Sequence, residues 1–166
     1  MHKEHKSDSP GAAWDSARRR LGGGLLSVVM PAYNLGDSIE KNIDEVRRVF
    51  SSAGISFEII VVDDGSGDET AAQLQKAAGG RDDLHPVYLS RNMGKGAALK
   101  YGFEASRGTY VLFLDADLDL PPDQVSVLFD VMDREKADVV IGSKRHPDSQ
   151  LNYPWHRRLR SAVYFG

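Results

Sequence analysis

Short apolar runs alternate with amphipathic segments along this sequence from residue 25 onward. The runs are rich in β-branched residues and predict five strands, at 25–30, 57–62, 85–89, 110–114 and 138–141. Apolar residues at helical spacing predict helices at 38–53, 68–78, 95–106, 121–136 and 154–165. Alternating helices and uniformly apolar strands are typical of a parallel sheet covered on both faces. We therefore predict an α/β fold with a Rossmann-like, mostly parallel sheet.

The first 24 residues do not follow this pattern. They are polar and end in three consecutive glycines at 22–24, which predicts a flexible tail over 1–24. A short basic helix at 14–21, lying on the domain or on a membrane, is the alternative. The core is expected to span 25–146, and residues 147–166 are expected to form a basic amphipathic helix.

Polar and charged residues follow nearly every predicted strand. They occupy 31–34, 63–66, 90–92, 115–117 and 143–145. In parallel α/β sheets, ligands bind beyond the carboxyl ends of the strands. Acidic pairs after two separate buried strands therefore predict one binding site at this edge, because scattered solvated loops would not produce them.

The charge distribution is uneven. The net charge is −3, yet residues 25–143 carry 11 basic against 20 acidic side chains, while both ends of the chain are basic. An acidic centre suits a divalent cation, and basic ends suit phosphates or a lipid surface. Because the chain has no cysteine, disulfides and thiolate metal sites are excluded, and any metal must use oxygen or histidine ligands.

Three carboxylates at alternate positions, Asp115, Asp117 and Asp119, follow the fourth predicted strand. If they converge on one side, their oxygens suit Mg²⁺ or Mn²⁺, which would stabilise a departing diphosphate. The motif is not an EF-hand loop, because Leu120 and Ser126 replace the required Gly and Glu. An acidic turn that caps the next helix is the alternative, and it suits Asp119 best.

Two further motifs indicate a nucleotide. Asp63 and Asp64 end the second strand, where a carboxylate can accept a hydrogen bond from a nucleobase, although turn formation alone would also explain them. Arg91 and Lys95 flank a glycine-containing loop at a helix start and can meet phosphate charge. This loop is not a P-loop, because Leu89 stands where its first glycine should be.

Four stretches together resemble glycosyltransferase family 2, which has the GT-A fold. They are SVVMPAYN, EIIVVDDGSGDET, RNMGKGAALKYGFEASRGTYVLFLDADLDLPP and VVIGSKRH, which lie within residues 25–146. Within the family, the chain looks most like the polyprenol-phosphate glycosyltransferases of the dolichol-phosphate mannosyl and glucosyl type. The resemblance implies an inverting, metal-dependent transfer of a sugar from a UDP- or GDP-sugar to a polyprenyl phosphate.

The resemblance also implies residue roles. Asp115 and Asp117 match the D-x-D pair of the family, which makes both of them catalytic, and Asp117 and Asp119 would hold the metal. Lys144 and Arg157 are the other implied catalytic residues, with Arg157 meeting the acceptor phosphate. The residues implied to bind the nucleotide are Pro31, Tyr33, Asn34, Asp63, Asp64, Arg91, Lys95 and Asp115.

Two other functions remain open on the sequence. One is a family 2 transferase that acts on a saccharide hydroxyl, and the other is a nucleotide-sugar-binding module without turnover. We expect a cytoplasmic protein at the inner face of the membrane, with peripheral lipid contact through residues 157–165 and no nucleic-acid partner. Because family members usually continue beyond these motifs, we also expect poor sugar transfer by this chain alone, and self-association through Tyr164 and Phe165.

Overall fold

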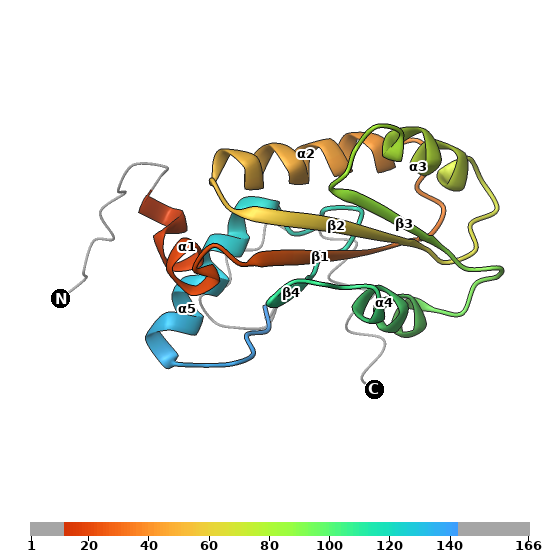
Figure 1. Ribbon diagram of the computed structural model, residues 1–166. Coiled ribbons are helices and arrows are strands. Elements are labelled where there is room, and N and C mark those ends of the chain that lie inside the picture. Colours follow the sequence, from red (N-terminus) through yellow and green to blue (C-terminus); the bar gives the residue numbers. More distant parts are fainter. Residues whose placement is uncertain (1–11, 143–166) are drawn as a thin grey trace, which may run out of the picture.

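A four-stranded parallel sheet forms the centre of the computed structural model, which describes residues 12–142 (Figure 1). The strands are β1 (Leu25–Ala32), β2 (Ser56–Asp63), β3 (Leu84–Tyr88) and β4 (Tyr110–Phe113), in the order β3-β2-β1-β4. The chain moves outward from β1 to β3 and then returns to place β4 on the other side of β1. The strand order therefore reverses between β1 and β4.

Helices connect the strands, and one more follows β4. They are α2 (Ile39–Ser52), α3 (Thr70–Ala78), α4 (Lys95–Glu104) and α5 (Val125–Glu135), with a short 3₁₀ helix, η2 (Pro122–Gln124), before α5. Figure 1 shows α2 and α3 on one side of the sheet and α4 on the other. The predicted α/β class, with a parallel sheet and helices on both faces, is confirmed.

The alternation of side chains along β1 and β2 builds two cores. A large core lies on one face of the sheet. It contains Val28 and Met30 of β1, the β2 residues paired with them, and apolar side chains of α2, α3 and α5. Val29 and its neighbours on the opposite face pack with Ala98 of α4 in a smaller core. Gly102 permits this second contact, because a Cβ atom there would lie 2.3 Å from the Val29 side chain.

The segment before β1 belongs to the fold. Residues Ala12–Trp14 form a 3₁₀ helix, η1, that leads into α1 (Asp15–Leu21). Trp14 is 7% exposed, with its ring 5.6 Å from that of Phe50, and Arg20 pairs with Asp133 of α5 at 2.7 Å. The predicted flexible tail is therefore wrong for residues 12–24, because one tryptophan and two further apolar side chains give this short helix a buried face.

The predicted fifth strand is also wrong within the described residues. Residues 138–142 contain no strand, and Val139 and Ile141 are 75% and 83% exposed. An apolar run becomes a strand only where a neighbouring strand pairs with its backbone. The predicted helix at 154–165 lies outside the described residues.

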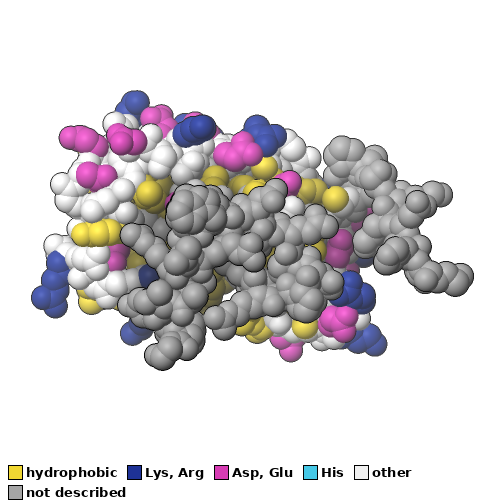
Figure 2. All heavy atoms as spheres, turned by 180° about the vertical axis from the view of Figure 1, so that it is seen from behind, with side chains coloured by type: hydrophobic (Ala, Val, Ile, Leu, Met, Phe, Trp, Pro, Cys, Tyr) yellow, Lys and Arg dark blue, Asp and Glu magenta, His cyan; other side chains and the backbone are white. Residues whose placement is uncertain are grey.

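The surface bears both charges and apolar side chains. Figure 2 shows acidic and basic side chains mixed along its upper edge, where α2 and α3 lie, and apolar side chains at several other places. Two ion pairs link the two helical segments, Glu40 to Lys76 at 3.3 Å and Asp44 to Arg81 at 2.6 Å. Among residues 12–142, no helix is long and apolar enough to cross a membrane.

Glu58 is a buried carboxylate at the opposite end of the sheet from the strand ends that carry the motifs. It is 2% exposed and accepts hydrogen bonds from the Ser27 hydroxyl at 2.6 Å and from the Arg107 side chain at 2.7 and 2.9 Å. Burial by itself would raise the pKa of Glu58. The hydrogen bonds from Ser27 and Arg107 outweigh burial, and the pKa is lowered.

The lowered pKa of Glu58 predicts a stability that is lost in acid. The ionised carboxylate stabilises the fold above its unfolded-state pKa, about 4.5, and this contribution disappears as the pH falls through the lower folded-state pKa. Glu58→Gln should therefore be less stable than wild type at neutral pH, and the difference should shrink below about pH 4.5. Urea unfolding between pH 7 and pH 3 measures this. A difference that is constant with pH would exclude the ionised carboxylate as its source.

Candidate nucleotide-sugar site

A cleft opens at the carboxyl ends of β1 and β4, where the strand order reverses. Its volume is about 380 Å³. It is lined by Pro31, Ala32, Tyr33, Leu35, Asp64, Asn92, Gly94, Lys95, Ala98, Asp115, Ala116 and Asp117. These residues come from the ends of β1, β2 and β4, from the loop before α4 and from α4. The cleft thus brings together the motifs that the sequence places after separate strands, at the position where open α/β sheets bind ligands.

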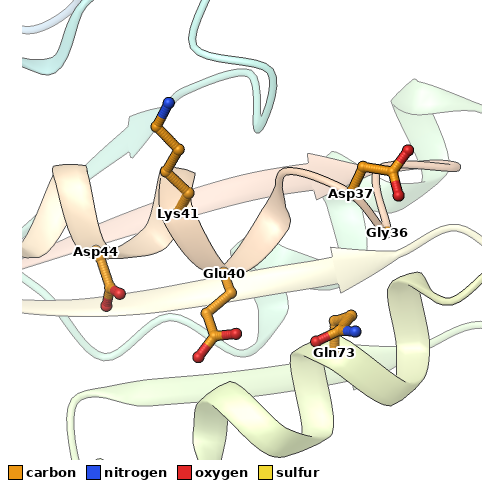
Figure 3. A pocket seen from close by; sticks show the side chains of 6 residues that line it. All are labelled: Gly36, Asp37, Glu40, Lys41, Asp44 and Gln73. Carbon is orange, nitrogen blue, oxygen red and sulfur yellow. The ribbon is translucent and has the colours of Figure 1, made fainter.

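A second hollow lies apart from the strand ends. It has a volume of about 490 Å³ and is lined by Gly36, Asp37, Glu40, Lys41, Asp44 and Gln73. Figure 3 shows Glu40 and Gln73 facing each other between α2 and α3, while Lys41 points away. Two of its carboxylates, Glu40 and Asp44, are already paired with basic side chains. We therefore interpret this hollow as a surface groove between helices, and not as the place where the sequence motifs meet.

The two aspartates that end β2 have different surroundings. Asp63 is 3% exposed and accepts hydrogen bonds from the backbone and hydroxyl of Ser66, so it shapes the turn. Asp64 is 4% exposed, lines the cleft, and accepts from the backbone N–H groups of Met93 and Gly94 at 2.7 and 2.9 Å. A carboxylate oxygen has two lone pairs, so Asp64 retains acceptor capacity for a ligand. The turn therefore accounts for Asp63, whereas Asp64 is the aspartate of this pair that lines the cleft.

The loops after β1 and β2 are tied together by hydrogen bonds. The backbone N–H of Asn34 donates to the Ser66 hydroxyl at 2.9 Å, and its side-chain oxygen accepts from the Gly67 N–H at 3.0 Å. Asn34 has a φ of 53°, a left-handed conformation that asparagine tolerates better than most residues. Asn34 does not line the cleft, so in this structure it joins the two loops.

A second set of bonds reinforces this junction. The Leu35 N–H donates to the Thr70 hydroxyl at 2.7 Å, and the Gly36 N–H donates to Asp68 at 3.0 Å. Hydrogen bonds from the Thr70 hydroxyl and from backbone N–H groups lower the pKa of Asp68. The first loop is consequently held by α3 as well as by its own strand.

Lys95 and Asp115 form an ion pair at the cleft. Lys95 begins α4 and Asp115 follows β4, and their charged atoms are 2.5 Å apart. Both side chains are about half exposed or more, at 60% and 47%. Because exposed ion pairs contribute little to stability, the pair can be separated at low cost. Lys95 is therefore close enough to the acidic motif to meet an anion that arrives beside it.

The carboxylate trio does not converge as the sequence suggested. Asp117 accepts from the backbone N–H of Asp119 at 3.1 Å, and Leu118 between them has a φ of 53°. No group of three acidic or histidine side chains suited to a metal occurs among residues 12–142. The possible convergence of all three carboxylates is therefore not found in the described structure, where a left-handed turn at Leu118 separates Asp117 from Asp119.

Of the other predicted site residues, some line the cleft, one lies apart from it, and two fall outside the residues that the structure describes. Pro31 and Tyr33 line the cleft, whereas Arg91 is exposed and does not. Lys144 and Arg157 lie outside the described residues.

Sequence reasoning missed two residues that shape the cleft. Gly65 has a φ of 65° and lies against the backbone of Arg91. Asn42 of α2 donates a hydrogen bond to the Ala116 carbonyl at 2.8 Å. A signal for Asn42 was present, because it is a polar residue between the core-facing positions Ile39 and Ile43, whereas the contact of Gly65 depends on tertiary structure.

A parallel sheet covered by helices on both faces, with acidic strand ends and a lysine at the cleft, is consistent with the family that the motifs resemble. The family model of glycosyl transferase family 2 matches residues 27–165. The chain belongs to this family.

Curated relatives indicate which group within the family the chain resembles. The chain is 42% identical over 135 residues to an undecaprenyl-phosphate 4-deoxy-4-formamido-L-arabinose transferase from Pseudomonas paraeruginosa, which covers 80% of this chain and 38% of the relative. A transferase with the same description from Edwardsiella ictaluri is 37% identical over 145 residues, covering 86% and 42%. The similarity to polyprenol-phosphate transferases is confirmed. The chain spans about two fifths of the length of these relatives.

Solved structures share the fold. Mannosyl-3-phosphoglycerate synthase from Rubrobacter xylanophilus superposes with a TM-score of 0.57 at 27% identity, over 74% of this chain and 41% of that one. Glucosyl-3-phosphoglycerate synthase from Mycobacterium tuberculosis, solved with Mn²⁺, UDP and glucosyl-3-phosphoglycerate, has a TM-score of 0.56 at 26% identity, over 80% and 46%. The GT-A type of α/β fold is thereby confirmed.

Proposed function

We propose that this chain is the donor-binding part of a glycosyltransferase that moves a sugar from a UDP- or GDP-sugar to a polyprenyl phosphate. The observation that carries the proposal is the cleft itself. It places Asp64, Lys95, Asp115 and Asp117 together at the reversal point of a parallel sheet. The names of the curated relatives, which are undecaprenyl-phosphate transferases, support the acceptor class.

The donor would lie across the cleft with its base near β1 and β2. Pro31 and Tyr33 provide apolar surface there, and Asp64 provides a buried acceptor for a base N–H. Lys95 and the exposed start of α4 lie toward β4, where they would meet the diphosphate. This orientation puts the sugar at the open edge of the cleft, beyond Asp117.

A divalent cation, Mg²⁺ or Mn²⁺, fits this edge when it is shared with the donor. Such cations are commonly held by one or two carboxylates together with substrate phosphates. Asp117, which is exposed at the cleft, would be the main protein ligand, with Asp119 beside it. When bound, the cation would neutralise charge on the departing diphosphate.

The chain would contribute mainly by positioning. An acceptor phosphate is already an anion, so it can attack the anomeric carbon with little help from a base. It would attack from the face opposite the departing diphosphate, which inverts the configuration at that carbon. Lys95, released from Asp115 by the incoming phosphates, would stabilise their charge. Arg157 is proposed to bind the acceptor phosphate at the cytoplasmic membrane surface, and Lys144 is proposed as a further catalytic residue.

The product distinguishes this function from its alternatives. The chain would be incubated with a panel of UDP- and GDP-sugars, Mn²⁺ and undecaprenyl phosphate, and the products separated by thin-layer chromatography. A lipid-linked sugar supports the proposal, even in the small amount expected of this chain alone. A product on a saccharide hydroxyl would indicate the other transferase class, and donor binding without turnover would indicate a binding module.

Asp64→Ala is expected to weaken binding of the whole nucleotide more than binding of pyrophosphate. Loss of a buried acceptor for the base should reduce affinity for UDP or GDP in Mn²⁺ by roughly tenfold, about 1.4 kcal/mol. Pyrophosphate with Mn²⁺ should be much less affected. Isothermal titration calorimetry of the variant and the wild type with UDP, GDP and pyrophosphate, each in Mn²⁺, measures both changes.

Asn92→Ala is the matched control for Asp64→Ala. Asn92 lies in the loop before α4 that Asp64 holds, and its side chain accepts from the Gly94 N–H at 3.1 Å, so its removal loosens this loop without removing the proposed base acceptor. If Asp64→Ala and Asn92→Ala weaken nucleotide and pyrophosphate alike, Asp64 only holds the loop.

A further inference from the structure

The Asn42 side chain of α2 reaches the loop that follows β4 and carries the acidic motif. Asn42 lies between Ile39 and Ile43, both of which are fully buried, so the backbone that carries it is fixed in the core. Its Nδ2 donates a 2.8 Å hydrogen bond to the carbonyl oxygen of Ala116. Ala116 is the middle residue of the D-x-D motif and is 1% exposed.

This bond holds the peptide unit that joins Ala116 to Asp117. A peptide unit is planar, so holding the Ala116 carbonyl also sets the direction of the Asp117 N–H. The chain then turns at Leu118, whose φ of 53° is unfavourable for a residue with a Cβ atom. Such a conformation persists only where surrounding contacts impose it. The bond from Asn42 is one of these contacts, and it comes from a rigid helix.

We propose that Asn42 is a positioning residue for the metal and the donor diphosphate. It holds the Ala116 peptide so that Asp115 and Asp117 both face the cleft. Asn42 does not line the cleft, and it acts through the backbone of the loop. The inference rests on the proposed function, since it assigns Asn42 a part in metal-dependent donor binding.

Asn42→Leu tests the inference. Leucine has a similar size and a higher helix propensity, so the variant removes the donor while the helix is retained. Affinity for UDP and GDP in Mn²⁺ would be measured by calorimetry on the 166-residue chain. Binding of the nucleoside alone in EDTA would be followed by NMR, and the melting temperature would be recorded. Gln75→Leu, which removes an exposed amide from α3, is the matched control.

The expected result is a selective loss. Asn42→Leu should bind the metal–nucleotide pair roughly tenfold more weakly, as is typical when a partner that orients metal ligands is lost. Nucleoside binding should be unchanged, and the melting temperature should fall only slightly, because one hydrogen bond to a buried carbonyl is lost. If Asn42→Leu binds the nucleotides in Mn²⁺ as tightly as the wild-type protein does, the inference is overturned and the proposed function remains intact. Equal losses with and without metal would also overturn it, because they indicate general destabilisation.

Two further outcomes are defined in advance. If Asn42→Leu fails to fold, Asn42→Ala, which also lacks the donor and adds no bulk, is required to show the same selective loss. If wild type shows no Mn²⁺-dependent nucleotide binding, the proposed function and the inference both fail.

Discussion

Gly65→Ala is expected to destabilise the protein by roughly 2–4 kcal/mol and to disrupt the donor cleft. Gly65 has a φ of 65°, which an L-residue with a Cβ atom adopts only at a cost. The added Cβ atom would also lie 2.3 Å from the carbonyl carbon of Arg91 and 2.6 Å from the Asn92 nitrogen. These are backbone atoms, so the loop itself must move.

Movement of this loop has a functional consequence. The next residues, Met93 and Gly94, donate the hydrogen bonds that Asp64 accepts, and Lys95 follows directly. Gly65→Ala should therefore lower both the free energy of unfolding, measured in urea, and the affinity for nucleotide. The control is Gly67→Ala, because no atom lies within 4 Å of a Cβ at Gly67. Equal stability of the two variants would show that the close contact with Arg91 is not rigid.

Asp117→Asn should weaken Mn²⁺-dependent binding of UDP or GDP by roughly a hundredfold, about 2.7 kcal/mol. Asparagine has nearly the same shape, so the variant removes the charge that a divalent cation requires and leaves the loop in place. Affinity in EDTA should change little. Calorimetric titrations with Mn²⁺ and with EDTA give the two values.

The control for Asp117→Asn is Asp130→Asn, which removes an exposed carboxylate from α5, away from the cleft. Both variants lower the acidic charge by the same amount, so general electrostatics cannot account for a difference between them. An Asp117→Asn protein that binds nucleotide in Mn²⁺ as tightly as Asp130→Asn would remove Asp117 from the metal site.

Hydrophobic periodicity predicted most of the fold because four of the strands and their connecting helices are strongly patterned. It failed where pairing or packing decides the outcome. The run at 138–141 is as apolar as a strand, but no strand of the described structure pairs with it. Trp14 lies in a polar segment that reads as a tail, yet it is buried against Phe50 through contacts that only the folded chain brings together.

The site was predictable to a similar extent. Asp64, Lys95, Asp115 and Asp117 lie at the cleft because parallel strands present their carboxyl ends at one edge. The arrangement of the carboxylates was not predictable, since it depends on the left-handed turn at Leu118. Whether an aspartate shapes a turn or lines a cleft depends on the orientation of its side chain, as the two residues at the end of β2 demonstrate.

We expect the cleft between the ends of β1 and β4 to bind a nucleoside diphosphate together with a divalent cation. Calorimetric titration of the 166-residue chain with UDP and with GDP, each in Mn²⁺ and in EDTA, tests it directly. The expected result is saturable binding of at least one of the two nucleotides, tighter in Mn²⁺ than in EDTA. Absence of binding for both nucleotides in Mn²⁺, by a protein shown to be folded, would contradict it.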